Sequence, residues 1–244
     1  MGSPLISLVI PLYNEEKRLE PRLTESLEFL IQHLDIPFEV VFVNDGSTDR
    51  TLEMLNGAKE AFPSVSIKIL SYAKNEGKGF AVKTGIMNAR AEKIIACDAD
   101  FSITLDEIDK FIKDLDDYDV VIGSKKHALT NTIVKQKILR RFLGKAFTGL
   151  VNYVFGLSYT DVTCGFKGFK SSVAKELFSK QITKRWSYDA EVLFLANKKG
   201  FKIKEIPVEW KHVEGGSISP VAVSFRSLKD LTLIIINYLL GKYR

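Results

Sequence analysis

The chain has 244 residues, and its 35 Lys and Arg against 30 Asp and Glu give a formal net charge of +5. Its 45% of hydrophobic residues supply a sizeable core, which excludes a disordered or collagen-like chain and predicts one compact domain. The two cysteines, Cys97 and Cys164, form no Cys-x-x-Cys site, so we expect two buried free thiols in a reducing compartment.

The first half of the chain alternates short β-branched runs with segments of helical periodicity. The expected strands are 6–10, 38–43, 67–70, 93–97 and 120–122, and the expected helices are 19–34, 51–61, 80–89 and 105–115. This alternation predicts an α/β fold, in which helices cover both faces of a mostly parallel sheet. After residue 123 come a basic amphipathic stretch, a Gly-Phe-rich run at 165–169, a helix near 189–197, a strand at 203–210 and an apolar tail from residue 225.

Acidic loops follow three of the expected strands, at residues 11–15, at 44–49 and at Asp98-Ala99-Asp100. Ligands of open α/β sheets bind beyond the carboxyl ends of the strands, so we expect the chemistry in these loops. Taken alone, residues 45–49 are better explained as a turn with a helix N-cap than as a binding loop. Asp98 and Asp100 repel each other unless a positive charge lies beside them. They therefore favour a Mg²⁺ or Mn²⁺ ion whose shell a substrate diphosphate completes.

A glycine-rich segment, Asn75-Glu76-Gly77-Lys78-Gly79, opens one of the expected helices. Its glycines allow a ligand to approach the backbone, the helix N-terminus favours an anion, and Lys78 can meet a phosphate. The segment lacks the eight-residue Walker spacing, which argues against a P-loop nucleotidase.

The four motifs at 9–15, 43–49, 75–79 and 98–100, in this order, resemble those of family 2 glycosyltransferases with the GT-A fold. Segments 122–125, 161–167 and 185–191 are most similar to dolichyl-phosphate glucosyltransferases, with dolichyl-phosphate mannose synthases as close relatives. The resemblance implies a Rossmann-like sheet and an inverting transfer of a hexose, for protein glycosylation, from a nucleotide diphosphate sugar to a polyprenyl or dolichyl phosphate.

UDP-glucose is the donor that the resemblance favours, and GDP-mannose is the alternative. A different class of function, a basic nucleic-acid-binding module, is also compatible with the net charge. The acidic loops argue against it because they would repel a polyanion. We therefore expect a nucleotide sugar, a lipid phosphate and a membrane surface as partners, and no nucleic acid.

The resemblance also implies roles for individual residues. The side chains and backbone expected to bind the nucleotide sugar are those of Pro11, Tyr13, Glu15, Asp45, Gly77, Lys78, Asp98 and Lys125. Asp100 is expected to hold the metal and to be needed for catalysis. Mannose synthases carry Arg in place of Lys125 and often a Gln ligand in place of Ser102, which leaves open both the donor sugar and the metal ligands beyond Asp100. Residues 1–123 would bind the nucleotide sugar, residues 124–210 the acceptor, and 211–244 would form an apolar, interfacial tail.

Asp189 stands where many family 2 enzymes place a general base, in a first helical turn whose acidic residues also complement the helix dipole. A phosphate monoester with a second pKa near ~6 is already largely ionised at neutral pH, so a lipid phosphate needs no such base. Positioning of the acceptor or the sugar by Asp189 is therefore our first interpretation, and proton transfer the second. Residues 181–186 are one residue too long for the Gln-x-x-Arg-Trp signature of processive synthases, which we discount.

Residues 120–160 contain no acidic residue. Their cations are Lys125, Lys126, Lys135, Lys137, Arg140, Arg141 and Lys145. If 134–155 is helical, a row of these cations borders a wide apolar arc. A solvated face over the core would explain this pattern, but cations unmixed with Glu favour a helix in an anionic membrane interface.

The resemblance places an acceptor-phosphate arginine at Arg140 or Arg141. The tail at 231–240 is either a core helix or a second interfacial anchor. The longest uncharged stretches, 146–160 and 231–241, are shorter than the about 20 apolar residues of a membrane-spanning helix. We therefore expect a peripheral enzyme on the cytoplasmic face of a membrane.

Overall fold

The computed structural model describes residues 4–20, 22–127, 130, 138–210 and 220–243, without the side chains of 138–143 and 220–226. The strands are β1 (Ile6–Leu12), β2 (Phe38–Asn44), β3 (Ser66–Ser71), β4 (Lys93–Ala96), β5 (Val120–Ser124), β6 (Lys167–Lys170) and β7 (Ile203–Pro207). The helices are α1 (Glu16–Leu19), α2 (Leu23–His33), α3 (Thr51–Ala61), α4 (Lys78–Asn88), α5 (Ile108–Asp117), α6 (Ile138–Phe155), α7 (Ser171–Lys180), α8 (Tyr188–Lys198) and α9 (Pro220–Leu239), with a 3₁₀ turn at Leu105–Glu107.

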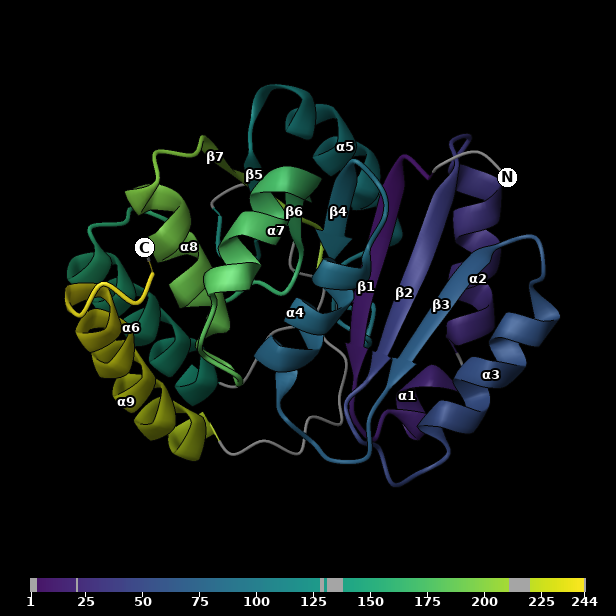
Figure 1. The fold of residues 1–244 in the computed structure, drawn as a ribbon, viewed down its shortest axis with the longest axis horizontal. Helices are drawn as coiled ribbons and strands as arrows, with labels where there is room; N and C mark the ends of the chain where they lie inside the picture. Colours follow the sequence, from purple (N-terminus) through teal and green to yellow (C-terminus); the bar gives the residue numbers. More distant parts are fainter. Residues whose placement is uncertain (1–3, 21, 128–129, 131–137, 211–219, 244) are drawn as a thin grey trace.

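The strands form one sheet in the order β3-β2-β1-β4-β6-β5-β7 (Figure 1). Strands β1 to β4 pair in parallel, as do β5 and β7, whereas β6 is antiparallel to both β4 and β5. The carboxyl ends of β1, β2 and β4 therefore lie side by side, which gathers the three acidic loops at one edge. The predicted α/β fold with a mostly parallel sheet is confirmed.

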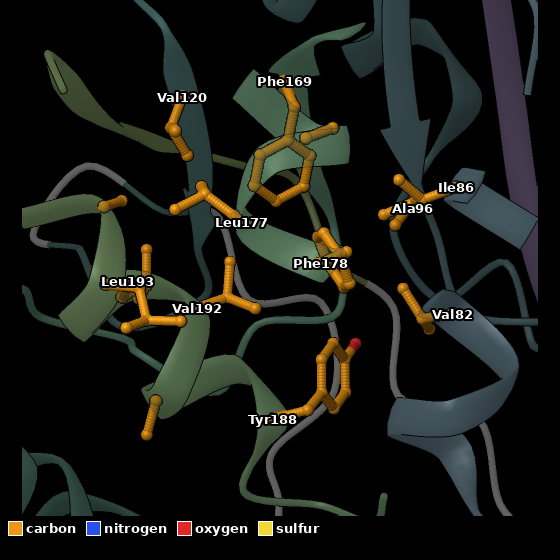
Figure 2. Packing of buried hydrophobic residues seen from close by; sticks show 14 of the residues in the cluster. Val82, Ile86, Ala96, Val120, Phe169, Leu177, Phe178, Tyr188, Val192 and Leu193 are labelled. Atoms are coloured by element: carbon orange, nitrogen blue, oxygen red, sulfur yellow. The ribbon is translucent and has the colours of Figure 1, made fainter. Parts of the chain in front are cut away.

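Each face of the sheet is covered by its own set of helices. On one face, alternate residues of β1 such as Leu8 and Ile10 pack with α1, α2, α3 and α5. On the other face, Val9 packs with α4, α7 and α8. Figure 2 shows how Val82, Phe178 and Tyr188 from these three helices meet in that second core. Burial of one such large apolar side chain contributes about 1.5–3 kcal/mol to the free energy of folding. The two layers of helices therefore stabilise the sheet from which the loops extend.

The structure differs from the sequence prediction in several elements. The expected helix at 19–34 corresponds to α2, which begins only at Leu23, and a separate short helix, α1, precedes it. The Gly-Phe-rich run supplies the antiparallel strand β6, and α7, which was not predicted, follows it directly. Strand β7 ends at Pro207, and Trp210 forms an isolated antiparallel bridge with Ile103 in the loop after β4. Of the expected basic helix, residues 134–137 lie outside the described residues.

The C-terminal helix α9 lies along α6 and also contacts α8 (Figure 1). Leu231 and Ile234 are buried against the core. The apolar side chains that α9 and the turn after it expose are Leu228, Leu233, Ile235, Ile236, Tyr238, Leu239 and Leu240. No helix within the described part of the chain is long and apolar enough to cross a membrane. Helix α9 therefore packs on the core with one side and exposes apolar side chains on another, and its role at a membrane interface stays a prediction.

Both cysteines are buried free thiols, as predicted. Burial raises the pKa of the Cys164 thiol to about 11, so it carries no thiolate at neutral pH.

Candidate functional site

The loops after β1 and β2 form one hydrogen-bonded unit. The amide of Asp45 donates to the carbonyl of Leu12 at 2.8 Å, and the amide of Thr48 donates to Asn14 Oδ1 at 2.8 Å. Asn14 adopts a left-handed conformation, with φ 53°, which asparagine tolerates better than most residues. Pro11 is buried in β1, whereas Tyr13 is 45% exposed. The ring of Tyr13 is thus presented to solvent on a rigid base.

Asp45 ties the glycine-rich segment to these two loops. Its buried carboxylate accepts hydrogen bonds from Asn75 Nδ2 at 2.8 Å, from the amide of Glu76 at 2.8 Å and from the amide of Gly77 at 3.0 Å. Gly77 has φ +110°, and a Cβ there would lie 2.6 Å from the carbonyl oxygen of Lys184. Only glycine fits this position. A carboxylate can accept about four hydrogen bonds, and these three donors use most of that capacity. The expected contact between Asp45 and a nucleotide base stays a prediction.

Lys78 and Asp98 form an ion pair at the carboxyl edge of the sheet, with Nζ 2.5 Å from Oδ1. Burial pushes the pKa of Asp98 upward, but Lys78 and then Lys125 outweigh it, and the pKa falls below its usual value. The backbone of Gly165 lies against the Asp98 carboxylate so closely that a Cβ would overlap it. On the other side, Lys78 Nζ lies 5.2 Å from the centre of the Trp186 ring.

Asp100 lies two residues beyond Asp98 in the same loop. Its Oδ1 accepts a hydrogen bond from the amide of Ser102 at 3.0 Å, and its carbonyl accepts one from Arg22 at 2.9 Å. Across from it, burial raises the pKa of Glu15 to about 7 against the opposing charge of Arg18. The charges of Asp100, Asp98 and Asp49 raise the same pKa further. Negative charge therefore accumulates between the first and third acidic loops.

The donor set of this edge fits a hard divalent cation that shares its shell with a ligand. Among the residues that the structure describes, no three His, Cys, Asp or Glu side chains converge on one point. Glu15 Oε2 is buried and accepts no hydrogen bond from the described residues, although Arg18 Nε lies 3.3 Å away. Mg²⁺ characteristically uses one or two carboxylates and completes its shell with phosphates and water. The surplus of carboxylate oxygens near Asp100 suits that mode and not an all-protein site.

A second group of charges surrounds Asp161, in the loop before β6. This aspartate is fully buried and pairs with Lys126 Nζ at 3.0 Å, while Thr163 Oγ1 donates to it at 3.0 Å. Burial raises the pKa of Asp161, but Lys125 and Lys126 together hold it below its usual value. Sequence reasoning gave Asp161 no role of its own. The available signal was its place as the first acidic residue after the basic block at 120–160.

A buried ion pair joins Lys167 of β6 to Asp189 of α8, with Nζ 2.5 Å from Oδ1. Their side chains are 3% and 5% exposed, and Lys167 also donates to the carbonyls of Val162 and Cys164. Burial raises the pKa of Asp189, although Lys167 and Lys78 oppose the shift. Lys167 was missed in the sequence, where its place inside the Gly-Phe-rich run at 165–169 was its only signal.

A model of the family described as "Glycosyl transferase family 2" matches residues 7–178, which carry the acidic loops, the glycine-rich segment, Asp161 and Lys167, but not Asp189. The chain belongs to glycosyltransferase family 2. It is 34% identical to the dolichyl-phosphate beta-glucosyltransferase of Saccharomyces cerevisiae over 98% of this chain and 76% of that protein. The Homo sapiens protein of the same name is 32% identical over 98% of this chain and 77% of its own length.

The fold of this glycosyltransferase is shared with solved structures. A glucosyl-3-phosphoglycerate synthase from Mycobacterium tuberculosis, crystallised with Mn²⁺ and UDP-glucose, superposes with a TM-score of 0.66. The match covers 94% of this chain and 78% of that one at 12% identity, so it supports the GT-A fold alone.

The glycosyltransferase brings most of the predicted site residues to one edge of its sheet. Charge interactions that shift pKa values connect Lys78, Asp98, Lys125 and Asp189. The charges of Asp98 and Asp100 also raise the pKa of Glu15. The backbone of Arg140 and Arg141 lies in α6, but their side chains lie outside the described residues. Lys135 and Lys137 lie outside them altogether. The roles of these four cations stay predictions.

Proposed function

We propose that this glycosyltransferase moves glucose from UDP-glucose to dolichyl phosphate, or to a related polyprenyl phosphate, with inversion at the anomeric carbon. The observation that carries the proposal is the similarity to dolichyl-phosphate beta-glucosyltransferases over 98% of the chain. That similarity spans the acidic loops and also the Asp161 and Asp189 clusters, which lie beyond the shared nucleotide-binding elements.

In this proposal, residues 1–123 hold the nucleotide sugar. Pro11, Tyr13 and Glu15 line the nucleoside site, and Tyr13 supplies an exposed ring for it. Asp45 contacts the base and Asp98 the ribose. Gly77 and Lys78 lie at the N-terminus of α4, where the helix dipole and the ammonium group both favour phosphate. Lys125 adds positive charge near Asp98.

Asp100 would hold a divalent cation, Mg²⁺ or Mn²⁺, together with the diphosphate of the donor. When bound, such an ion would offset the negative charge that develops on the departing nucleotide diphosphate. The surplus of carboxylate oxygens near Asp100 and Glu15 supports a cation at this edge.

Residues 124–210 would receive the acceptor. The lipid phosphate is already largely ionised at neutral pH and attacks the anomeric carbon on the face opposite the diphosphate, so one displacement inverts it. Asp189 would orient the acceptor or the sugar, since Lys167 occupies one of its carboxylate oxygens. The guanidinium group of Arg140 or Arg141 would bind the lipid phosphate through paired donors.

A membrane surface would present the lipid, and residues 211–244 would help to dock on it from the cytoplasmic side. The exposed apolar face of α9 supports this, because contiguous apolar surface beside cations is typical of an interfacial helix. On α6, Tyr153 is 89% exposed and Lys145 is exposed.

The experiment is a comparison of donors. Released nucleotide is measured with UDP-glucose, UDP-galactose, GDP-mannose and GDP-glucose, each with and without dolichyl phosphate and with Mn²⁺ present. We expect lipid-dependent release from UDP-glucose above all. Preference for GDP-mannose would instead identify a mannose synthase.

A further pair of variants tests the acceptor site. Arg140→Lys and Arg141→Lys keep the charge but lose the paired donors, so one of them should lower transfer far more than it lowers binding to anionic liposomes. If both keep full transfer in detergent, the acceptor phosphate is held elsewhere.

A further inference from the structure

Glu191 holds the loop that precedes its own helix, α8. Its carboxylate is fully buried, and it accepts hydrogen bonds from the amides of Ile182 at 2.9 Å and Thr183 at 2.8 Å. A third donor comes from the far end of the chain, where the hydroxyl of Tyr243 donates to Glu191 Oε1 at 2.6 Å. A buried carboxylate needs such donors in place of water, so Tyr243 helps to hold the loop through Glu191.

The chain turns sharply after α9 to bring Tyr243 to this position. Gly241 has φ +71°, its amide donates to the carbonyl of Tyr238, and the amide of Lys242 donates to the carbonyl of Asn237. This pair of hydrogen bonds is a Schellman motif, which ends a helix and reverses the chain at glycine. The C-terminus therefore returns to the side of α8 (Figure 1), and Tyr243 is only 6% exposed.

The loop held by Glu191, residues 181–187, packs on the glycine-rich start of α4. The amide of Phe80 donates to the carbonyl of Lys184 at 2.9 Å, and a Cβ at Gly79 would lie 2.6 Å from the carbonyl of Thr183. Lys184 Nζ also pairs with Glu76 at 2.7 Å. The loop therefore touches the segment that we expect to meet the donor phosphates, with no space between the two backbones.

The same loop carries Trp186, which is 41% exposed and stands beside the Lys78–Asp98 pair. Displacement of the loop would move this ring away from Lys78 and would loosen the start of α4. A second link comes from α9, because Ser187 Oγ donates to Asp230 Oδ2 at 2.9 Å. The chain from α9 onward is thus linked to this loop twice, directly through Asp230 and, through Glu191, by Tyr243.

We propose that Tyr243 and Glu191 are positioning residues for the nucleotide sugar. They hold residues 181–187 against the start of α4 and so keep Trp186 and Lys78 in place, without touching the substrate themselves. The identity of the ligand as a nucleotide diphosphate sugar rests on the proposed function, whereas the coupling between Tyr243 and Trp186 does not.

The test uses Tyr243→Phe, which removes one hydroxyl, and Glu191→Gln, which replaces one acceptor oxygen by a donor. Both should raise the KM for UDP-glucose and the Kd for UDP by about tenfold or more, the ratio that corresponds to loss of one hydrogen bond to a charged group. The kcat at saturating donor and the KM for dolichyl phosphate should change little. The matched control is Ser7→Ala, because Ser7 donates to the buried Glu39 with the same 2.6 Å distance at the opposite end of the sheet.

Acrylamide quenching of tryptophan fluorescence supplies a readout that needs no substrate. Trp210 is buried, so quenching reports mainly on Trp186, and it should increase in Tyr243→Phe but not in Ser7→Ala. Unchanged quenching, together with an unchanged UDP Kd and a melting temperature lowered as in the control, would reduce the pair to a structural role. If the wild-type enzyme fails to use UDP-glucose, the proposed function fails, while the quenching result still decides the coupling. Should Glu191→Gln fail to fold, Tyr243→Phe alone decides.

Discussion

Replacement of Lys167 by Met leaves the Asp189 carboxylate buried without its cation. The two side chains are 3% and 5% exposed and 2.5 Å apart, and Met has a similar length without the charge. Removal of one partner from a buried ion pair typically costs about 3–5 kcal/mol. Domains are stable by only about 5–15 kcal/mol, so the Lys167→Met protein should fold but lose a large part of its stability.

The loss should depend on pH in a direction that the burial of Asp189 fixes. Burial already raises the pKa of Asp189 in the folded state, and without Lys167 the pKa rises further. A carboxyl with a raised folded pKa binds more protons in the folded than in the unfolded state. Stability therefore falls as pH rises from the unfolded pKa through the folded one. The difference between the variant and the wild type should be largest at neutral pH and should shrink in acid.

Urea unfolding at about pH 5 and at about pH 8 measures this difference as a shift in midpoint at constant slope. The double variant Lys167→Met/Asp189→Asn should recover part of the loss at about pH 8, because no charge is then left buried. An equal loss at both pH values, or a double variant no more stable than the single one, would refute the assigned ion pair.

Three further predictions concern the acidic edge of the site. Glu15→Gln should stabilise the protein by an amount that grows from pH 4.5 to about 7 and then stays constant. The reason is that folding raises the pKa of Glu15 from 4.5 to about 7, so the ionised carboxylate destabilises the folded state; thermal melts over a pH series check this. Gly165→Ala should lower transfer at least about tenfold, since the new Cβ overlaps the Asp98 carboxylate; an unaltered kcat/KM would contradict it. Asp100→Asn should melt like the wild type yet not turn over, and near-normal transfer in saturating Mn²⁺ would remove Asp100 from the metal site.

The strands and their acidic loops could be predicted because their signals are local. A β-branched run followed by Asp98-Ala99-Asp100 is visible in any window of the sequence, and parallel strands bring such loops together. Strand β6 was missed because its sequence, Lys167-Gly168-Phe169-Lys170, is short and has glycine and two cations. The segment is a strand because it pairs with β4 and β5, although most of its residues have low β-propensity.

The interior charges could not be predicted because their partners are distant in the sequence. Lys167 and Asp189 are 22 residues apart, and Tyr243 and Glu191 are 52 apart. The local sequence does not indicate that Glu191 accepts hydrogen bonds from loop amides. Acidic residues are favourable in the first turn of any helix, where they are usually exposed to solvent. The resemblance located the segments around Asp161 and Glu191, but their contacts needed the tertiary structure.

The most direct test of the proposed function is the product formed from radiolabelled UDP-glucose and dolichyl phosphate. The lipid fraction is extracted, and the anomeric configuration of its sugar is determined. We predict β-linked glucosyl phosphate lipid from the α-linked donor, formed with Mg²⁺ or Mn²⁺ and absent after chelation by EDTA. Label that stays in the aqueous phase, or an α-linked product, would contradict an inverting transfer of glucose to a lipid phosphate.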